Sequence, residues 1–199
     1  MRIFTIGLLG IIFLCGFTST LPTTKFNDTR DGVDYGAITI GDLQIMNTNL
    51  KFQNETAFCY EDLERYCNHF GKLYSFKMVV DKEGNIKEDI CPKGWNIPTL
   101  EEWEYLILGM NPIITRGKNG KMDYTISKNY AQLQFGGFRS HEGEFYFNMG
   151  KEGHYMTSTL TDDGWATIKI KREGKGYKIA VIKNTNEDRA VSCRCVKNK

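Results

Sequence analysis

The stretch CPKGWNIPTLEEW, residues 91–103, carries the strongest structural signal in the chain. Thr99 and Glu102 have the spacing of a capping box, in which each side chain accepts a hydrogen bond from the backbone N–H of the other residue at a helix start. Pro98 stands just before the cap, where its missing N–H does no harm. We therefore predict a helix that begins at Thr99, ends within residues 109–112 and buries one apolar stripe: Trp103, Leu106, Ile107 and Met110.

Two β-type patterns precede this helix. Residues 33–46 place Gly41-Asp42 between two apolar stretches, and Ile38 and Ile40 alternate there with polar or small residues, which is typical of a β-hairpin with a Gly-first turn. Residues 74–80 also alternate, with Tyr, Phe, Met and Val at every second position, and a polar turn signal follows at residues 81–84. We predict a hairpin over the first segment and a strand followed by a turn over the second.

A second helix is predicted between these two segments. Apolar residues recur at helical spacing over Glu61–Phe70, and Gly71 follows as a helix terminator. The pattern places Cys67 on the inward face of this short amphipathic helix. The four periodic positions are Leu63, Tyr66, Cys67 and Phe70.

The second half of the chain changes to strand patterns. Residues 113–149 are rich in Gly, Asn and Lys without sustained periodicity, which predicts long loops with short strands. Residues 166–171 and 177–181 alternate apolar and polar side chains around a Gly-rich turn, which predicts two half-buried antiparallel strands. A third strand is predicted over residues 189–196, with Val191, Cys193 and Cys195 on one face.

Composition favours a single compact domain. The chain has 199 residues, 41% of them hydrophobic, and 26 Lys+Arg against 24 Asp+Glu give a net charge of +2. This hydrophobic content is enough to bury a core, which excludes intrinsic disorder. The sequence has no cluster of basic residues of the kind that indicates nucleic-acid binding. We predict one domain over residues 21–199 and no nucleic-acid partner.

The first twenty residues have the pattern of a secretory signal peptide. Arg2 precedes an apolar run over residues 3–17, and Thr18-Ser19-Thr20 supply the small polar cleavage region. The run is shorter than the roughly 20 residues that span a bilayer, so cleavage is favoured over a membrane anchor. We predict a mature chain without a membrane span that is secreted or held at the cell surface; lipid attachment at Cys15 is the less favoured alternative, because bulky residues precede it.

Five cysteines remain after the predicted cleavage, which permits two bridges and one leftover thiol. Their spacing alone does not determine the pairing. Cys193 and Cys195 are close in sequence, but a zinc site would need a second close pair or a histidine at ligand spacing, and neither is present. Export favours structural disulfides, so no metal ligand and no cofactor are predicted.

No catalytic constellation is evident. His69, His141 and His154 stand without a nucleophile elbow or a reactive-cysteine signature, and we predict solvated surface histidines. The pair Asp162-Asp163 is interpreted as a surface turn, not as a calcium site. A set of aromatic residues is predicted to serve mainly in packing and partly in a binding surface: Phe135, Phe138, Phe145, Tyr146, Phe147, Tyr155 and Trp165.

Taken in order, several motifs resemble one known family, the Fibrobacter succinogenes major paralogous domain. The resemblance covers nearly all of the mature chain, and its most specific block is residues 91–103. The chain departs from the family pattern at three places: it has Ile45-Met46 where the family usually has Trp-Met, Asn96 where it has His, and Tyr-Met-Thr-Ser-Thr at residues 155–159 where it has Phe-Trp-Ser-Ser-Thr. The change at Asn96 puts any function that depends on the His in question. The other matching positions are Asp31-Gly32, Tyr35, Ile40-Gly41, Asn49-Leu50, Cys59-Tyr60, Cys67, residues 71–74 and residues 192–197.

The resemblance implies an exported bacterial protein with an α+β, C-type-lectin-like fold, similar also to formylglycine-generating enzymes. That fold has two helices beside a twisted antiparallel sheet, a long loop region and neighbouring termini, and it is stapled here by disulfides. The family has a single cysteine where Cys195 stands, so the resemblance implies the pairs Cys59–Cys67 and Cys91–Cys195, with Cys193 as a free thiol buried beside the second bridge. Intermolecular pairing of Cys193 is the alternative.

These expectations lead to a hypothesis about function. We expect a non-catalytic, exported binding module whose partner is an extracellular glycan or protein; its ligand-binding residues are not identified by the sequence. A formylglycine-generating-enzyme-like oxidase is the first alternative and would use Cys193 and Cys195 as its reactive pair. A structural surface or pilus-tip component is the second alternative.

Overall fold

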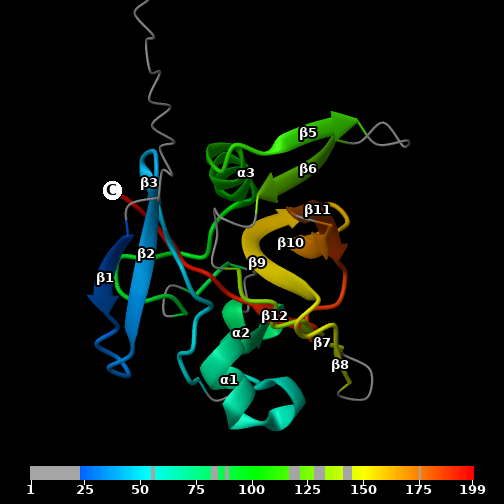
Figure 1. Ribbon diagram of the computed structural model, residues 1–199. Helices are drawn as coiled ribbons and strands as arrows, with labels where there is room; N and C mark the ends of the chain where they lie inside the picture. Colours follow the sequence, from blue (N-terminus) through cyan, green and yellow to red (C-terminus); the bar gives the residue numbers. More distant parts are fainter. Residues whose placement is uncertain are drawn as a thin grey trace, which may run out of the picture.

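The computed structural model describes residues 23–54, 57–81, 85–87, 90–116, 122–127, 133–140, 145–174 and 176–199. Within these residues the chain has an α+β fold of a small four-stranded sheet, a large nine-stranded sheet and a few short helices (Figure 1). The predicted signal peptide, Cys15 and His141 lie outside the described residues. No helix in the described part of the chain has the length and apolar character needed to cross a membrane.

The small sheet joins the first and last described strands. Its order is β1-β2-β3-β13, so strands from both ends of the described chain share one sheet (Figure 1). The predicted hairpin is confirmed: β2 and β3 are antiparallel and connected by Gly41-Asp42, with Gly41 at φ +56°. The strands are β1 (Thr23–Asn27), β2 (Asp34–Ile40), β3 (Leu43–Met46) and β13 (Val196–Asn198).

The large sheet is built around the long hairpins β9-β10-β11. Its order is β5-β6-β11-β10-β9-β12-β7-β8, and β4 also pairs with β12. The two predicted strands around the turn at residues 173–176 are confirmed as β10 and β11. The strands are β4 (Leu73–Ser75), β5 (Ile113–Arg116), β6 (Met122–Ser127), β7 (Phe138–Arg139), β8 (Tyr146–Phe147), β9 (Glu152–Thr161), β10 (Gly164–Glu173), β11 (Gly176–Asn184) and β12 (Ala190–Ser192).

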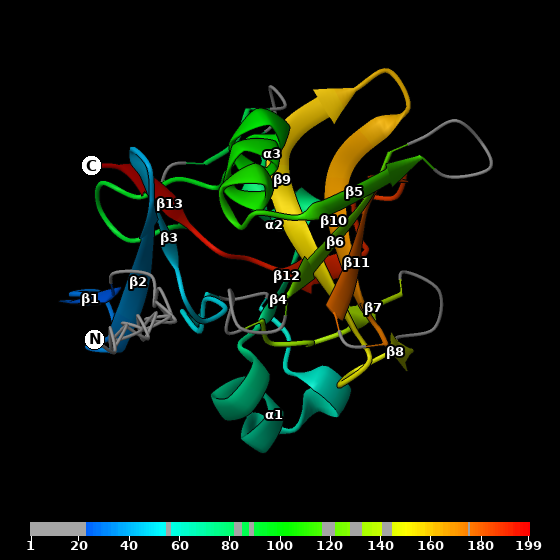
Figure 2. The ribbon, with the colours of Figure 1, turned by 45° about the horizontal axis from the view of Figure 1, so that its top comes forward.

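The predicted strand over residues 189–196 is interrupted. Strand β12 ends at Ser192 in the large sheet and β13 begins at Val196 in the small sheet, so residues 193–195 cross between the sheets (Figure 2). The crossing is held by β3 and the segment that follows it: Leu50 N donates to the carbonyl of Cys193 (2.8 Å) and Met46 N to that of Cys195 (3.0 Å). A local alternation pattern cannot indicate that one run of strand-forming residues serves two sheets.

The helices partly differ from the prediction. The first one begins at Glu64, not at Glu61, because Glu61 and Asp62 have left-handed φ angles of +52° and +55° that break the helix. The predicted strand over residues 74–80 ends at Ser75, and a short helix follows that buries Phe76 and Val79, three residues apart. The helices are the 3₁₀ helix η1 (Tyr60–Asp62), α1 (Glu64–Phe70), α2 (Phe76–Val79) and α3 (Leu100–Gly109).

Helix α3 forms as its sequence predicts. Glu102 N donates to Thr99 Oγ1 (3.1 Å) and Thr99 N donates to Glu102 Oε2 (2.8 Å), so the capping box is complete. The predicted stripe is buried, and Trp103 Nε1 donates to the carbonyl of Met156 in β9 (3.3 Å). Gly109 lies directly against Ile40 of the small sheet, where a Cβ atom would be only 2.1 Å from Ile40 Cγ2. Close approach therefore requires a glycine at this position.

The buried side chains form two apolar clusters. One combines the stripe of α3 with isoleucines of β10, β11 and the first hairpin, among them Ile168 and Ile38. The other surrounds the Cys91–Cys195 disulfide and includes Phe76 and Trp165, whose rings stack at 5.2 Å. Strand β10 contributes Ile168 to the first cluster and Trp165 to the second, as residues three apart in a strand point to opposite faces.

Candidate functional site

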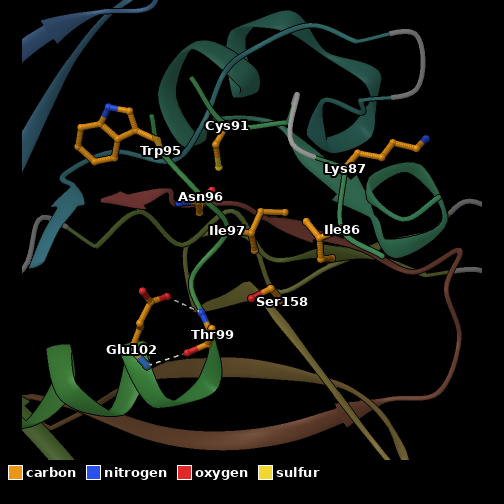
Figure 3. Close-up of a pocket in the computed structure, with 9 residues that line it drawn as sticks. All are labelled: Ile86, Lys87, Cys91, Trp95, Asn96, Ile97, Thr99, Glu102 and Ser158. Atoms are coloured by element: carbon orange, nitrogen blue, oxygen red, sulfur yellow. Dashed lines mark hydrogen bonds between the residues drawn. The ribbon is translucent and has the colours of Figure 1, made fainter. Parts of the chain in front are cut away.

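A pocket lies beside the start of α3, where segments far apart in sequence meet. It has a volume of about 380 Å³, within the range of small-ligand sites. One wall is the segment ahead of α3, and the opposite side comes from residues 86–87 and from β9 (Figure 3). The lining residues are Ile86, Lys87, Cys91, Trp95, Asn96, Ile97, Thr99, Glu102 and Ser158.

Backbone hydrogen bonds fix the wall ahead of α3. Asn96 pairs with Val196 of β13 through both backbone groups, each N–H···O distance being 2.8 Å. Ser158 N donates to the carbonyl of Pro98 (2.9 Å), which attaches the same segment to β9. The wall is thereby held between the two sheets, and the Cys91–Cys195 disulfide adds a covalent link at its start. The pocket is consequently preformed by the tertiary structure.

Several polar groups at the pocket are available to a ligand. The Asn96 amide and the Ser158 hydroxyl make no side-chain hydrogen bond with any described residue. Glu102 uses Oε2 for the cap, so its other oxygen is open, while Lys87 Nζ donates to the carbonyl of Met78 (3.0 Å).

Figure 3 shows Ile86, Ile97 and Ser158 close together on the inner side of the pocket, whereas the end of Lys87 points away. The pocket thus combines an apolar floor with hydroxyl, amide and carboxylate groups. This is the chemistry with which proteins bind small polar molecules.

Trp95 supports the wall but does not offer a free ring face. Phe26 stacks on it at a centroid distance of 4.4 Å, and Lys197 Nζ lies 5.0 Å from its ring centroid. The side chain is only 5% exposed. Stacking of a ligand on this ring is therefore blocked.

The structure contains both disulfides that the family resemblance implies. Cys59 is bonded to Cys67, with Cα atoms 5.0 Å apart, and Cys91 to Cys195, with Cα atoms 5.9 Å apart. Cys193 is a buried thiol whose Sγ lies 4.0 Å from that of Cys195. Burial raises the pKa of the Cys193 thiol to about 12, so the thiolate is scarce at neutral pH.

Cys193 lies beside the second disulfide, as the family resemblance implied. The Sγ atoms of Cys91, Cys193 and Cys195 all lie within 4.8 Å of one another, a proximity that the spacing of these residues did not reveal. The oxidase alternative needs Cys193 and Cys195 as a pair of thiols, but Cys195 is bonded to Cys91 here. Arg194, which lies between the two cysteines in the sequence, is buried as well: its Nε donates to Asn49 Oδ1 (2.9 Å), and its guanidinium lies over the ring of Tyr155.

The histidine prediction holds for one residue and is wrong for another. His69 is exposed as expected. His154 is only 2% exposed because it lies in β9, a strand that the sequence analysis did not predict. The Thr-rich run over residues 157–161 was a β signal that could have indicated this strand.

His154 is held in a buried polar group. Its Nε2 contacts Glu152 Oε2 (3.3 Å), and its Nδ1 accepts from Arg189 Nη2 (3.2 Å). Burial, with the positive charge of Arg189, lowers the pKa of His154 to about 4. Lys169 Nζ also contacts Glu152 Oε2 (3.1 Å), and the hydrogen bonds of Lys169 and His154 lower the pKa of Glu152 against the effect of burial. At neutral pH a neutral imidazole thus lies between an anion and a cation.

The structure divides the aromatic residues that the sequence singled out. Phe135, Tyr155 and Trp165 are buried in the two clusters, whereas Phe145 and Phe147 are 63% and 43% exposed. Phe138 and Tyr146 are half-buried. The turn Asp162-Asp163 is exposed between β9 and β10, as predicted, and Asp163 pairs with Lys183.

Comparison with known proteins identifies the family. Residues 28–197 match the Fibrobacter succinogenes major domain, and the chain belongs to this family. The match takes in the large sheet, the two disulfides and the pocket, and it leaves only β1 and the last residue of β13 of the small sheet outside. Comparisons with curated proteins and with solved structures gave no match.

Proposed function

We propose that this chain is an exported bacterial binding module that holds a small polar group, such as the terminal sugar unit of a glycan, in the pocket beside α3. It acts without turnover, adopts a C-type-lectin-like arrangement and works outside the cell or at its surface. Family membership and the two disulfides support this proposal, since structural disulfides persist in oxidising compartments.

The observation that carries the proposal is a set of polar groups at the pocket that make no side-chain hydrogen bond with any described residue. Asn96, Ser158 and Glu102 line a volume of about 380 Å³ together with Ile86 and Ile97. A sugar ring has an apolar face and hydroxyl edges, which matches this division. An amide and a carboxylate together supply both donors and acceptors for neighbouring hydroxyls.

The proposal can be tested with a glycan array followed by calorimetric titration of the best ligand. Replacing Asn96 by Ala and Ser158 by Ala is expected to weaken binding about 2- to 13-fold each, as one hydrogen bond contributes about 0.5–1.5 kcal/mol. Lys93→Ala is the matched control, because Lys93 is exposed in the same segment but does not line the pocket. Binding that is unaffected by Asn96→Ala and Ser158→Ala would show that the pocket is not the site.

The predicted localisation has a separate test. Mass spectrometry of the mature N-terminus distinguishes cleavage near Thr20 from lipid attachment at Cys15. Cleavage with an unmodified N-terminus is the expected result.

A further inference from the structure

Cys193 lies where it can replace Cys195 as the partner of Cys91. All three side chains are buried, and the three Sγ atoms lie within 4.8 Å of one another. The Sγ atoms of Cys193 and Cys195 are 4.0 Å apart, so a thiol is in contact with an existing disulfide. A thiolate that meets a disulfide sulfur can displace its partner.

We propose that Cys193 is an internal exchange partner, whose thiolate displaces Cys195 from Cys91 when the C-terminal segment loosens and so gives this segment a second covalent attachment point. A new bond forms between the sulfurs of Cys193 and Cys91, and the Cys91–Cys195 bond breaks. The electron pair of the broken bond leaves with the sulfur of Cys195, which takes up the proton that Cys193 released. The number of disulfides is unchanged, so neither an oxidant nor a reductant is needed.

The native arrangement keeps this exchange inactive. Displacement requires the attacking sulfur to approach Cys91 from the side opposite Cys195, whereas Cys193 Sγ lies close to Cys195. The same burial that packs Cys193 also disfavours its thiolate. Residues 193–195 must therefore detach from Met46 and Leu50, whose N–H groups bind the carbonyls of Cys195 and Cys193, before exchange can occur.

The exchange has a defined structural consequence. Cys195 is the residue directly before β13, so the native bridge attaches this strand covalently at its start. With Cys193 as the partner, the attachment moves two residues back, to the end of β12. Strand β13 is then held to β3 and Asn96 only by its hydrogen bonds, and its amide protons should exchange faster.

The test uses proteins in which Cys15 is replaced by Ala, so that Cys193 is the only free thiol expected even where the predicted signal peptide is retained. The protein is held in mild denaturant without reductant, quenched with an alkylating agent and mapped by non-reducing peptide analysis. We expect label on Cys193 at first and then a growing fraction on Cys195, with a Cys91–Cys193 peptide and a rate that is independent of protein concentration. The rate should rise about tenfold per pH unit below a thiol pKa near 8.5.

Two variants complete the test. Cys193→Ala has no thiol left and should show no label on Cys195 under the same conditions, while Cys195→Ala should contain a Cys91–Cys193 bridge. Faster amide exchange in β13 is expected in Cys195→Ala but not in Cys193→Ala. The proposal is overturned if label stays on Cys193 alone in the denaturant experiment, or if label moves to Cys91, which would indicate a Cys193–Cys195 bridge. The main denaturant experiment depends on no substitution within the described fold, since Cys15 lies outside the described residues.

Discussion

Removing the Cys91–Cys195 bridge should destabilise the protein far more than removing the Cys59–Cys67 bridge. The perturbation is the double substitution Cys91→Ala/Cys195→Ala, compared with Cys59→Ala/Cys67→Ala. The two bridges differ mainly in the length of chain that they close, with sequence separations of 104 and 8 residues. Each bridge limits the conformations of the unfolded chain, and a longer closed loop removes more of them.

Loop length gives the size of each effect. For a separation of 104 residues the chain-entropy relation gives about 4.7 kcal/mol of stabilisation. For a separation of 8 residues the same relation gives about 2.5 kcal/mol. The expected difference between the two double variants is therefore about 2 kcal/mol, which is a large part of the stability of an ordinary domain.

The loss of a buried sulfur needs its own control. Cys193→Ala removes a fully buried sulfur from the same cluster without breaking a bridge, so it measures the packing cost alone. The assay is urea unfolding followed by the fluorescence of Trp95, Trp103 and Trp165, which are all buried. Equal losses in the two bridge variants, or a loss in Cys91→Ala/Cys195→Ala no greater than in Cys193→Ala, would refute the loop-length argument.

Three further predictions concern the fold. Because the pKa of His154 falls from 6.5 in the unfolded chain to about 4 in the folded one, stability should drop by about 3 kcal/mol as the pH is lowered from 6.5 to 4, and unfolding of His154→Gln at both pH values should show a smaller drop. The lowered pKa of Glu152 acts in the same direction, since its contribution is present above pH 4.5 and is lost as the pH falls through the folded value. Thr99→Ala should cost about 1 kcal/mol in thermal unfolding by removing the cap of α3, whereas Thr24→Ala on exposed β1 should have almost no effect. Gly109→Ala, which would stabilise an ordinary helix, should instead destabilise this protein by about 1–3 kcal/mol, because the new methyl group meets Ile40; a rise in the melting temperature would contradict the close contact.

Local patterns predicted the elements whose hydrogen bonds join residues that are close in the sequence. The capping box joins residues three apart, and the hairpin around Gly41 joins neighbours across a two-residue turn. Such contacts depend on side chains that are close in the chain, so their spacing is visible in the sequence. The same local view placed a helix start at Glu61 that the structure moves to Glu64.

The candidate site was not predictable in this way. Its wall at residues 95–99 was recognised as a motif, but Ser158 and residues 86–87 gave no signal that they face it. The burial of His154 was missed because strand β9 was not predicted, and its hydrogen bond with Arg189, 35 residues away, was not visible in the sequence. Pairings at such separations are selected by the packing of whole sheets, which a single sequence does not display.

The sequence by itself determined that the chain has a capped helix with one apolar stripe, a first hairpin and a pair of long C-terminal strands. It also contained enough motifs to indicate the family. Only the tertiary structure decided that residues 193–195 cross between two sheets and that a pocket opens beside α3. The physical reason is that periodicity and capping reflect interactions between near neighbours in the chain, whereas the crossing and the pocket come from contacts between residues up to 149 positions apart.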